Sequence, residues 1–299
     1  MRESGLSLFE AVVALGILSV ASISILLTYD DAWSFFKKGE NAIEQQQSVR
    51  TAFDKLNLDL QLAGFNYNPD GDSARNDEQV EAAFDTAIVI RADFDAQDAT
   101  ASATPETAMA GGAFESVSID NSEIVAYVLA KPDGSSTGSL VFNADVKDTP
   151  RDGVVETVTL TNVALVHNNP PYALYRVSLN NDTTQWGSSD FFVRTLLAEN
   201  INSVAFRYYD GSGTQINSTY NLTTISDDIG GAESTTALAQ RKNVRRIEMD
   251  LVGLTRDPDI IWRDPNDTNP ATRRYRKFQL RGDVTPRNVG KVGVADLVN

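Results

Sequence analysis

The sequence predicts an α+β protein in which a long N-terminal helix, half of it membrane-embedded, packs on an antiparallel, β-rich globular head. Three observations predict this class. Residues 11–27 carry no charge, an apolar stripe with spacings of three and four residues then continues to Ala63, and the rest consists of short β-type segments separated by turn residues. We therefore expect a helix over residues 6–64 and a head over residues 65–299.

Composition limits the classes of function. With 299 residues, 41% of them hydrophobic, the chain has enough apolar material for a sizeable core. A formal charge of −15 disfavours general binding to nucleic acid or to anionic lipid. The chain has no cysteine, which excludes disulfides, thiolate metal sites and cysteine nucleophiles.

The first part of the predicted helix, residues 6–29, has the length and apolar character of a membrane span. Its one charged residue before Asp30 is Glu10. A carboxylate inside a membrane costs about 2.5–3.5 kcal/mol on insertion scales, so Glu10 calls for a partner or a function.

The residues around this acid carry a family resemblance. The stretch ESGLSLFEAVVALGIL resembles the class III leader junction of type IV prepilins, in which a short polar leader ends in glycine. The resemblance implies that residues 1–5 are a leader, that a prepilin peptidase cuts between Gly5 and Leu6, and that the new amino group of Leu6 is methylated. It also implies that Glu10 neutralises the amino terminus of a neighbouring subunit during assembly. The chain departs from the family at Leu6, where phenylalanine is usual.

Three other interpretations of this segment remain open. An ordinary secretory signal would use Arg2 as its basic region and cleave after Ala21, although Glu10 would interrupt its apolar core. A simple membrane anchor is the second, and the charge bias does not decide it because Lys37 and Lys38 balance Arg2. A helix buried in a protein core is the third, which a run uncharged on all faces disfavours.

After Asp30 and Asp31 the helix is predicted to become amphipathic over residues 30–64. Its stripe comprises Phe36, Ile43, Val49, Phe53, Leu56, Leu60 and Ala63, whereas Gln45 and Asp59 fall among the polar positions between them. Gly64 and Pro69 supply the stop signal. The ending formed by Asp59, Leu60, Ala63, Gly64 and Phe65 resembles minor pilins of the PilW type and J-type pseudopilins.

The head is predicted to be a single antiparallel α+β unit. Turn residues at 131–134 and 210–211 separate predicted hairpin partners. A short helical piece is expected near residues 235–241, and residues 99–112 are expected to form a surface loop. The predicted strands are 86–94, 122–130, 138–144, 155–165, 172–179, 201–210, 243–254 and 273–284.

The sequence gives no support for catalysis. The single histidine, His167, is expected to be a surface turn residue, and no phosphate-binding, dinucleotide-binding or zinc-binding motif occurs. Acidic residues at 70–78 are expected to form a solvated loop, with a calcium site as the alternative. We expect no enzyme activity, no cofactor and no metal.

Basic residues gather between Arg241 and Lys291, which could dock an acidic neighbouring subunit or, as an alternative without specific support, DNA. The resemblance implies a structural minor pilin that primes or caps type IV pilus assembly at the tip or initiation complex. Its partners would be other pilin or pseudopilin subunits, the prepilin peptidase and the cytoplasmic membrane. The head would lie outside, first on a single-pass membrane protein and then on a filament. Alternatives are a type II secretion pseudopilin of the J type, a pilin-stem adhesin or DNA-uptake binder, and a membrane-anchored binding domain.

Overall fold

A computed structural model of the chain describes residues 8–64, 80–92, 124–144, 156–179, 192–216, 241, 243–259 and 262–286. The chain divides into two compact units, Met1–Glu44 and Gln45–Asn299, so the division falls inside the first helix. Each unit is described by itself. The predicted short helix at 235–241 lies outside the described residues except for Arg241, and the predicted loop at 99–112 lies wholly outside them.

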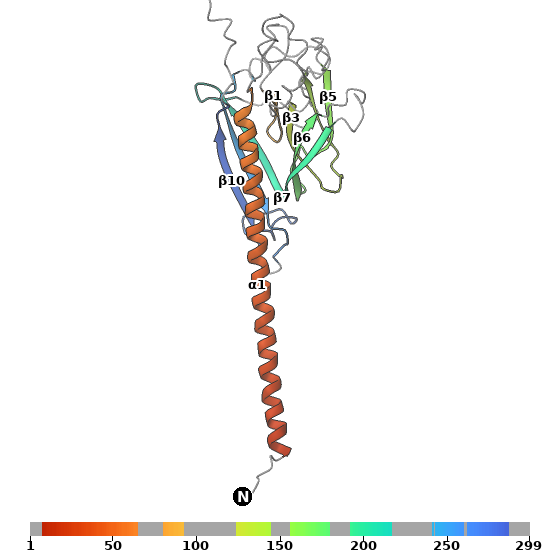
Figure 1. Cartoon of the computed structure of the whole chain (residues 1–299), viewed down its shortest axis with the longest axis vertical. Helices are drawn as coiled ribbons and strands as arrows, with labels where there is room; N and C mark the ends of the chain where they lie inside the picture. The colour runs from red at the N-terminus through yellow and green to blue at the C-terminus, as the bar shows by residue number, and fades with distance from the viewer. Residues whose placement is uncertain are drawn as a thin grey trace, which may run out of the picture. The chain divides into compact units, whose positions relative to one another are not determined.

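The N-terminal helix α1 runs from Leu8 to Leu62, which confirms the predicted long helix (Figure 1). It continues without interruption through Gly16 and Gly39. At its end Gly64 adopts a positive φ of 74° and donates its backbone N–H to the carbonyl of Arg91 at 2.8 Å. Glycine favours this left-handed conformation just after a helix, so the predicted stop signal acts as expected.

An antiparallel sheet forms the centre of the second unit and confirms the predicted fold class. Its strand order is β1-β2-β3-β6-β7-β9-β10, and the short β8 pairs with β7. Every pairing is antiparallel. The strands are β1 (Val80–Ala83), β2 (Ile88–Arg91), β3 (Ile124–Ala130), β6 (Tyr172–Leu179), β7 (Phe192–Tyr209), β8 (Gln215–Ile216), β9 (Arg246–Leu254) and β10 (Lys277–Val284).

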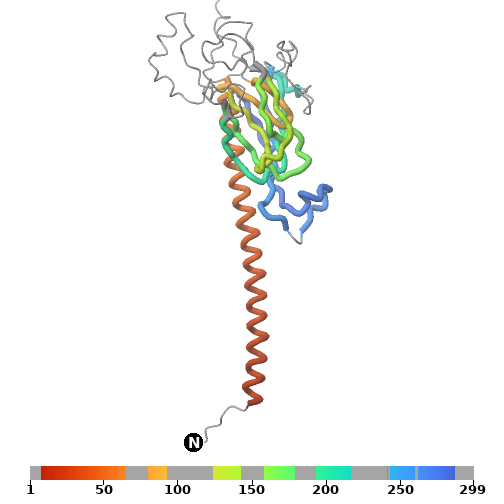
Figure 2. The backbone as a smooth tube through the Cα atoms, turned by 90° about the vertical axis from the view of Figure 1, so that its right-hand side faces the viewer, coloured from red at the N-terminus to blue at the C-terminus, as the bar shows by residue number. Residues whose placement is uncertain are grey.

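A separate hairpin is formed by β4 (Gly138–Ala144) and β5 (Glu156–Val163). The predicted turn before it is present, since Gly134, with φ 73°, donates its N–H to the carbonyl of Lys131 at 3.0 Å. After β9 the chain leaves the sheet, and Figure 2 shows this segment (blue) projecting beyond the strands before β10 returns.

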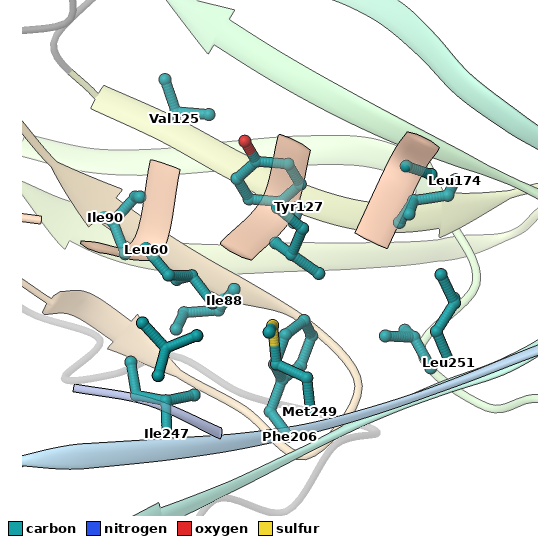
Figure 3. Packing of buried hydrophobic residues seen from close by; sticks show 14 of the residues in the cluster. Leu60, Ile88, Ile90, Val125, Tyr127, Leu174, Phe206, Ile247, Met249 and Leu251 are labelled. Atoms are coloured by element: carbon teal, nitrogen blue, oxygen red, sulfur yellow. The ribbon is translucent and has the colours of Figure 1, made fainter. Parts of the chain in front are cut away.

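The main core lies between the sheet and the α1 segment that begins at Gln45. Leu56 and Leu60 are fully buried against residues of both ends of the sheet, including Ile88 of β2 and Met249 of β9. Figure 3 shows Leu60, Ile88, Phe206 and Met249 converging in this layer. Burying each side chain of this size stabilises the fold by about 1.5–3 kcal/mol, so the helix and the sheet depend on each other for stability.

The opposite face of the sheet covers a second core. Strand β3 is buried along its whole length because Val125, Tyr127 and Leu129 face the helix layer whereas Ala126 and Val128 face the hairpin layer. Leu140, Phe142, Val158 and Leu160 of the hairpin complete this second cluster. The head therefore has three layers, with the large sheet between the helix and the hairpin.

Two glycines let the helix approach the sheet closely. A Cβ added at Gly253 of β9 would lie 2.5 Å from Val49 Cγ2 and 2.8 Å from Gln45 Nε2. One added at Gly282 of β10 would lie 2.9 Å from the Phe53 ring. These distances are below van der Waals contact, so any larger residue would push the helix and the sheet apart.

Candidate functional site

Within the first unit, the α1 segment Leu8–Leu27 presents apolar side chains to its surroundings on all faces, apart from Glu10. Such a run would normally be covered by protein or lipid, because water-exposed helices keep only one apolar stripe. Among the described residues, α1 is the one helix long and apolar enough to cross a membrane, and its most apolar window has no buried side chain. A signal sequence would meet the same criterion. The side chains between 44% and 85% exposed are Leu8, Phe9, Val12, Val13, Leu15, Ile17, Leu18, Val20, Ile23, Ile25, Leu26 and Leu27.

Three hydroxyl groups in this part of the helix are satisfied by the helix itself. Ser19 donates to the carbonyl of Leu15 at 2.7 Å, Ser24 to that of Val20 at 3.0 Å, and Thr28 to that of Ser24 at 2.8 Å. A hydroxyl with no partner in hydrocarbon costs several kcal/mol. These three bonds therefore remove that cost for three of the hydroxyl groups in the segment.

Glu10, the predicted assembly residue, lies in the first turn of α1 and is exposed. A negative charge at this position is favourable for the helix because the N-terminal N–H groups carry partial positive charge. The predicted cleavage residues Gly5 and Leu6 lie outside the described residues. The structure thus places one of the three predicted processing and assembly residues.

A buried carboxylate connects α1 to the sheet in the second unit. The side chain of Asp59 is 1% exposed, accepts hydrogen bonds from the Tyr127 hydroxyl and from Arg176 Nε at 2.9 Å, and pairs with Lys55 Nζ at 2.9 Å. Two effects raise the pKa of Tyr127 well above its ordinary value. The larger is burial of the phenol, and the second is the negative charge of Asp59. The phenol therefore stays protonated and donates to the carboxylate.

Sequence reasoning placed Asp59 and Gln45 on the polar side of the helix, and this was wrong. The buried face follows the spacing Gln45, Val49, Ala52, Leu56, Asp59, in alternating steps of four and three. Starting the stripe from Val49 and continuing through Ala52, instead of the half-buried Phe53, would have brought Asp59 onto the buried face. The sequence signal for this site was thus a carboxylate, Asp59, at a position that the helical spacing assigns to the buried face.

Gln45 has a related function at a break in the sheet. Its Nε2 donates to the carbonyls of Glu199 and Asn200 at 3.2 and 3.3 Å. Asn200 has a positive φ of 55°, and the pairing of β7 with β9 shifts register between Ile201 and Ser203. Because these carbonyls lie at the irregularity, Gln45 satisfies backbone groups that a regular ladder would have paired.

Several of the basic C-terminal residues are paired with carboxylates. Arg276 lies 3.5 Å from Asp259 and Lys277 lies 2.8 Å from Asp267. On the outer face of the sheet, Glu248 accepts hydrogen bonds from Arg207 at 2.5 Å and from Arg281. These pairs leave less positive charge for a polyanion than the sequence alone suggests.

His167, expected to be a surface turn residue, lies in the segment between β5 and β6, and its side chain is partly buried. The ring packs against Tyr172 with centroids 5.6 Å apart, and its Nε2 is buried without a hydrogen-bond partner. Burial lowers the pKa of His167 to about 4. The ring is therefore neutral at physiological pH and forms part of the packing beside β6.

No group of three or more histidine or carboxylate side chains is placed to hold a metal within the described part of the chain. The acidic stretch 70–78, which gave the calcium alternative, falls outside those ranges.

Comparison of this chain with family models, with curated proteins and with solved structures found no match. Its function must therefore be inferred from its own residues and geometry. The features available for that purpose are the exposed apolar segment of α1, the acid in its first turn, and the close attachment of the later part of the helix to the sheet.

Proposed function

We propose that this chain is a minor subunit of a type IV pilus-like filament, with a structural rather than a catalytic function. The observation that carries the proposal is the exposed apolar surface of α1 from Leu8 to Leu27, interrupted by the single carboxylate of Glu10. The leader-like sequence that ends at Gly5 supports the same assignment.

The apolar surface would have two successive environments. Before assembly, lipid of the cytoplasmic membrane covers a single-pass helix, which residues 6–29 are long enough to form. After assembly, the equivalent helices of neighbouring subunits cover the same side chains. The head stays outside the membrane in both states.

Glu10 would pair with a neighbouring subunit during assembly. Cleavage after Gly5 creates an amino terminus on Leu6, and we propose that this group, after methylation, pairs with Glu10 of an adjacent subunit. An opposite charge offsets the cost of burying the carboxylate in an apolar bundle and fixes the longitudinal register of the two helices. Loss of the charge should therefore impair assembly more than folding.

The large head, residues 65–299, and the PilW-like ending near Gly64 favour a tip or initiation complex over the filament shaft. A J-type pseudopilin of a type II secretion system is the second candidate, favoured by the same helix ending. Regular high-copy occurrence along purified shafts would contradict the tip assignment. Loss of protein secretion, without loss of pili, on deletion would favour the pseudopilin.

The test compares Glu10→Gln with Asp31→Asn in cells that contain the native assembly machinery. Both changes convert a carboxylate on the same helix to an amide, but only Glu10 lies within the apolar span. We expect both variants to be processed and membrane-inserted, with Glu10→Gln alone absent from sheared filaments. Equal incorporation of Glu10→Gln and the wild type would contradict the assembly function of this carboxylate.

A further inference from the structure

An aromatic face follows directly after the apolar run of α1. Tyr29, Trp33 and Phe36 are spaced by four and three residues, which places them on one side of the helix. They remain 67%, 48% and 60% exposed, and the rings of Trp33 and Phe36 stack with centroids 6.0 Å apart. The face is exposed, and no core formed by the described residues of its unit covers it.

Charged groups border this face without giving it a net charge. Lys37 Nζ lies over the Trp33 ring at 5.7 Å from the centroid. Lys38 follows it, and Asp30 and Asp31 precede Trp33. Two acids and two bases within one short segment suit a zwitterionic surface, which offers phosphate to the lysines and ammonium to the aspartates.

The distance along the helix places this segment at the boundary of a bilayer. From Leu8 to Tyr29 the helix rises about 32 Å, close to the hydrocarbon thickness of about 30 Å. Trp33 then lies about 6 Å further along the axis, at the depth of the phospholipid head groups. Tryptophan and tyrosine are enriched at this depth because their rings are apolar and their N–H or O–H groups need polar partners.

We propose that Tyr29, Trp33, Phe36 and Lys37 form an interfacial anchor that binds the phospholipid head-group region on the side of the membrane facing the head. The proposal rests on the membrane span included in the proposed function and adds the residues that set its depth. Lys37 keeps its ammonium toward the phosphates while the aromatic rings insert beside the glycerol region.

The test uses the full-length chain in phosphatidylcholine vesicles and reads the depth of single tryptophans. The chain has three tryptophans, so Trp186→Phe and Trp262→Phe leave Trp33 as the probe. Fluorescence quenching is compared between lipids brominated near the head group and lipids brominated near the chain end. We expect Trp33 to be quenched more strongly by the first kind, by at least about twofold, given the depth placement from the helix rise.

Two matched probes separate the anchor from the span. In a background that also carries Trp33→Phe, Leu18→Trp reports the middle of the span and Glu44→Trp reports a point about 22 Å beyond Tyr29. We expect deep quenching for Leu18→Trp and none for Glu44→Trp. Suppose that Leu18→Trp is quenched deeply but Trp33 is not quenched, or is quenched mainly by the deep label. Either result overturns the anchor and leaves the span intact. Absence of quenching at both positions overturns the span and the anchor together.

Discussion

Asp59→Asn tests how the helix is attached to the head. The carboxylate is 1% exposed and interacts with Tyr127, with Arg176, whose side chain is 17% exposed, and with Lys55, which is 43% exposed. Breaking a buried ion pair by removing one partner typically costs about 3–5 kcal/mol. Lys55 is screened by water, so its share is small and most of the loss comes from Arg176. We expect a loss near the lower limit, about 3 kcal/mol.

The assay is urea unfolding of the full-length chain in detergent micelles, followed by near-UV circular dichroism of the head. Asp54→Asn, an exposed acid on the same helix, is the control and should change the free energy of unfolding by less than about 0.5 kcal/mol. On heating, a loss of about 3 kcal/mol corresponds to a decrease in Tm of roughly 6–12 °C for a head of this size.

A second variant checks that the loss arises from the cluster. Tyr127→Phe removes one hydrogen bond to a carboxylate that keeps Arg176, so we expect a loss of about 1–2 kcal/mol. In the double variant with Asp59→Asn, the two losses should not add, with a coupling of at least about 0.5 kcal/mol. Two results would refute the cluster as the attachment of the helix to the sheet. One is a free energy of unfolding for Asp59→Asn within about 1 kcal/mol of the wild type, and the other is strict additivity of the two losses in the double variant.

Three further predictions concern single positions. Gly253→Ala should lower the free energy of unfolding by about 1–3 kcal/mol, because its Cβ would meet Val49 Cγ2 at 2.5 Å. The control Gly211→Ala, whose nearest contact would be 3.7 Å, should change this free energy by less than about 1 kcal/mol. Equal effects of the two variants in urea unfolding would contradict the close packing. The folded-state pKa of His167, about 4, lies below the unfolded value of 6.5. The contribution of neutral His167 to stability is therefore full above pH 6.5 and decreases by up to about 3 kcal/mol as the pH falls to 4. His167→Gln should remove this decrease, and a variant with the same pH profile of stability as the wild type would contradict the prediction. At Gly39 an added Cβ would have nothing within 4 Å, so Gly39→Ala should stabilise the helix by about 1 kcal/mol, measured by circular dichroism. Filament incorporation should remain intact. Loss of incorporation would show that the helix must bend at this glycine.

Helical periodicity and turn residues predicted most of the fold. The stop signal at Gly64 predicted the end of α1 to within two residues, and the turn at 131–134 lies where expected. Strands with regular alternation, such as Tyr172–Leu179, coincide with their predicted ranges. These features are encoded locally, in spacing and in residues that tolerate special dihedral angles, so sequence alone suffices for them.

The parts that were missed depend on partners distant in the chain. Residues 201–210 were predicted as a strand, but β7 begins at Phe192, and its first half contains Glu199 and Asn200, which strand patterns disfavour. Gln45 of the helix satisfies the carbonyls at that point, so a contact across the fold permits the long strand. Helical spacing could have placed Asp59 on the buried face, but it could not identify the partners Tyr127 and Arg176, which lie on strands far along the chain.

The candidate site divides in the same way. Glu10 and the apolar run could be recognised from local sequence, because one acid in an otherwise uncharged stretch is evident without knowledge of the fold. The aromatic face at Tyr29, Trp33 and Phe36 emerged only when exposure and ring stacking were available. Exposure is a property of the folded chain, and spacing alone does not distinguish a packed aromatic from one that faces lipid.

The most direct test of the proposed function is the mass of the mature N-terminal peptide, from membranes of cells with and without the native prepilin peptidase. A filament subunit should yield a peptide that begins at N-methylated Leu6 when the peptidase is present and an intact Met1 when it is absent. A peptide that begins at Ser22 in both strains would identify an ordinary cleaved signal and contradict the membrane helix and the filament function together. An intact Met1 in both strains would contradict pilin-type processing and leave a head on a simple membrane anchor.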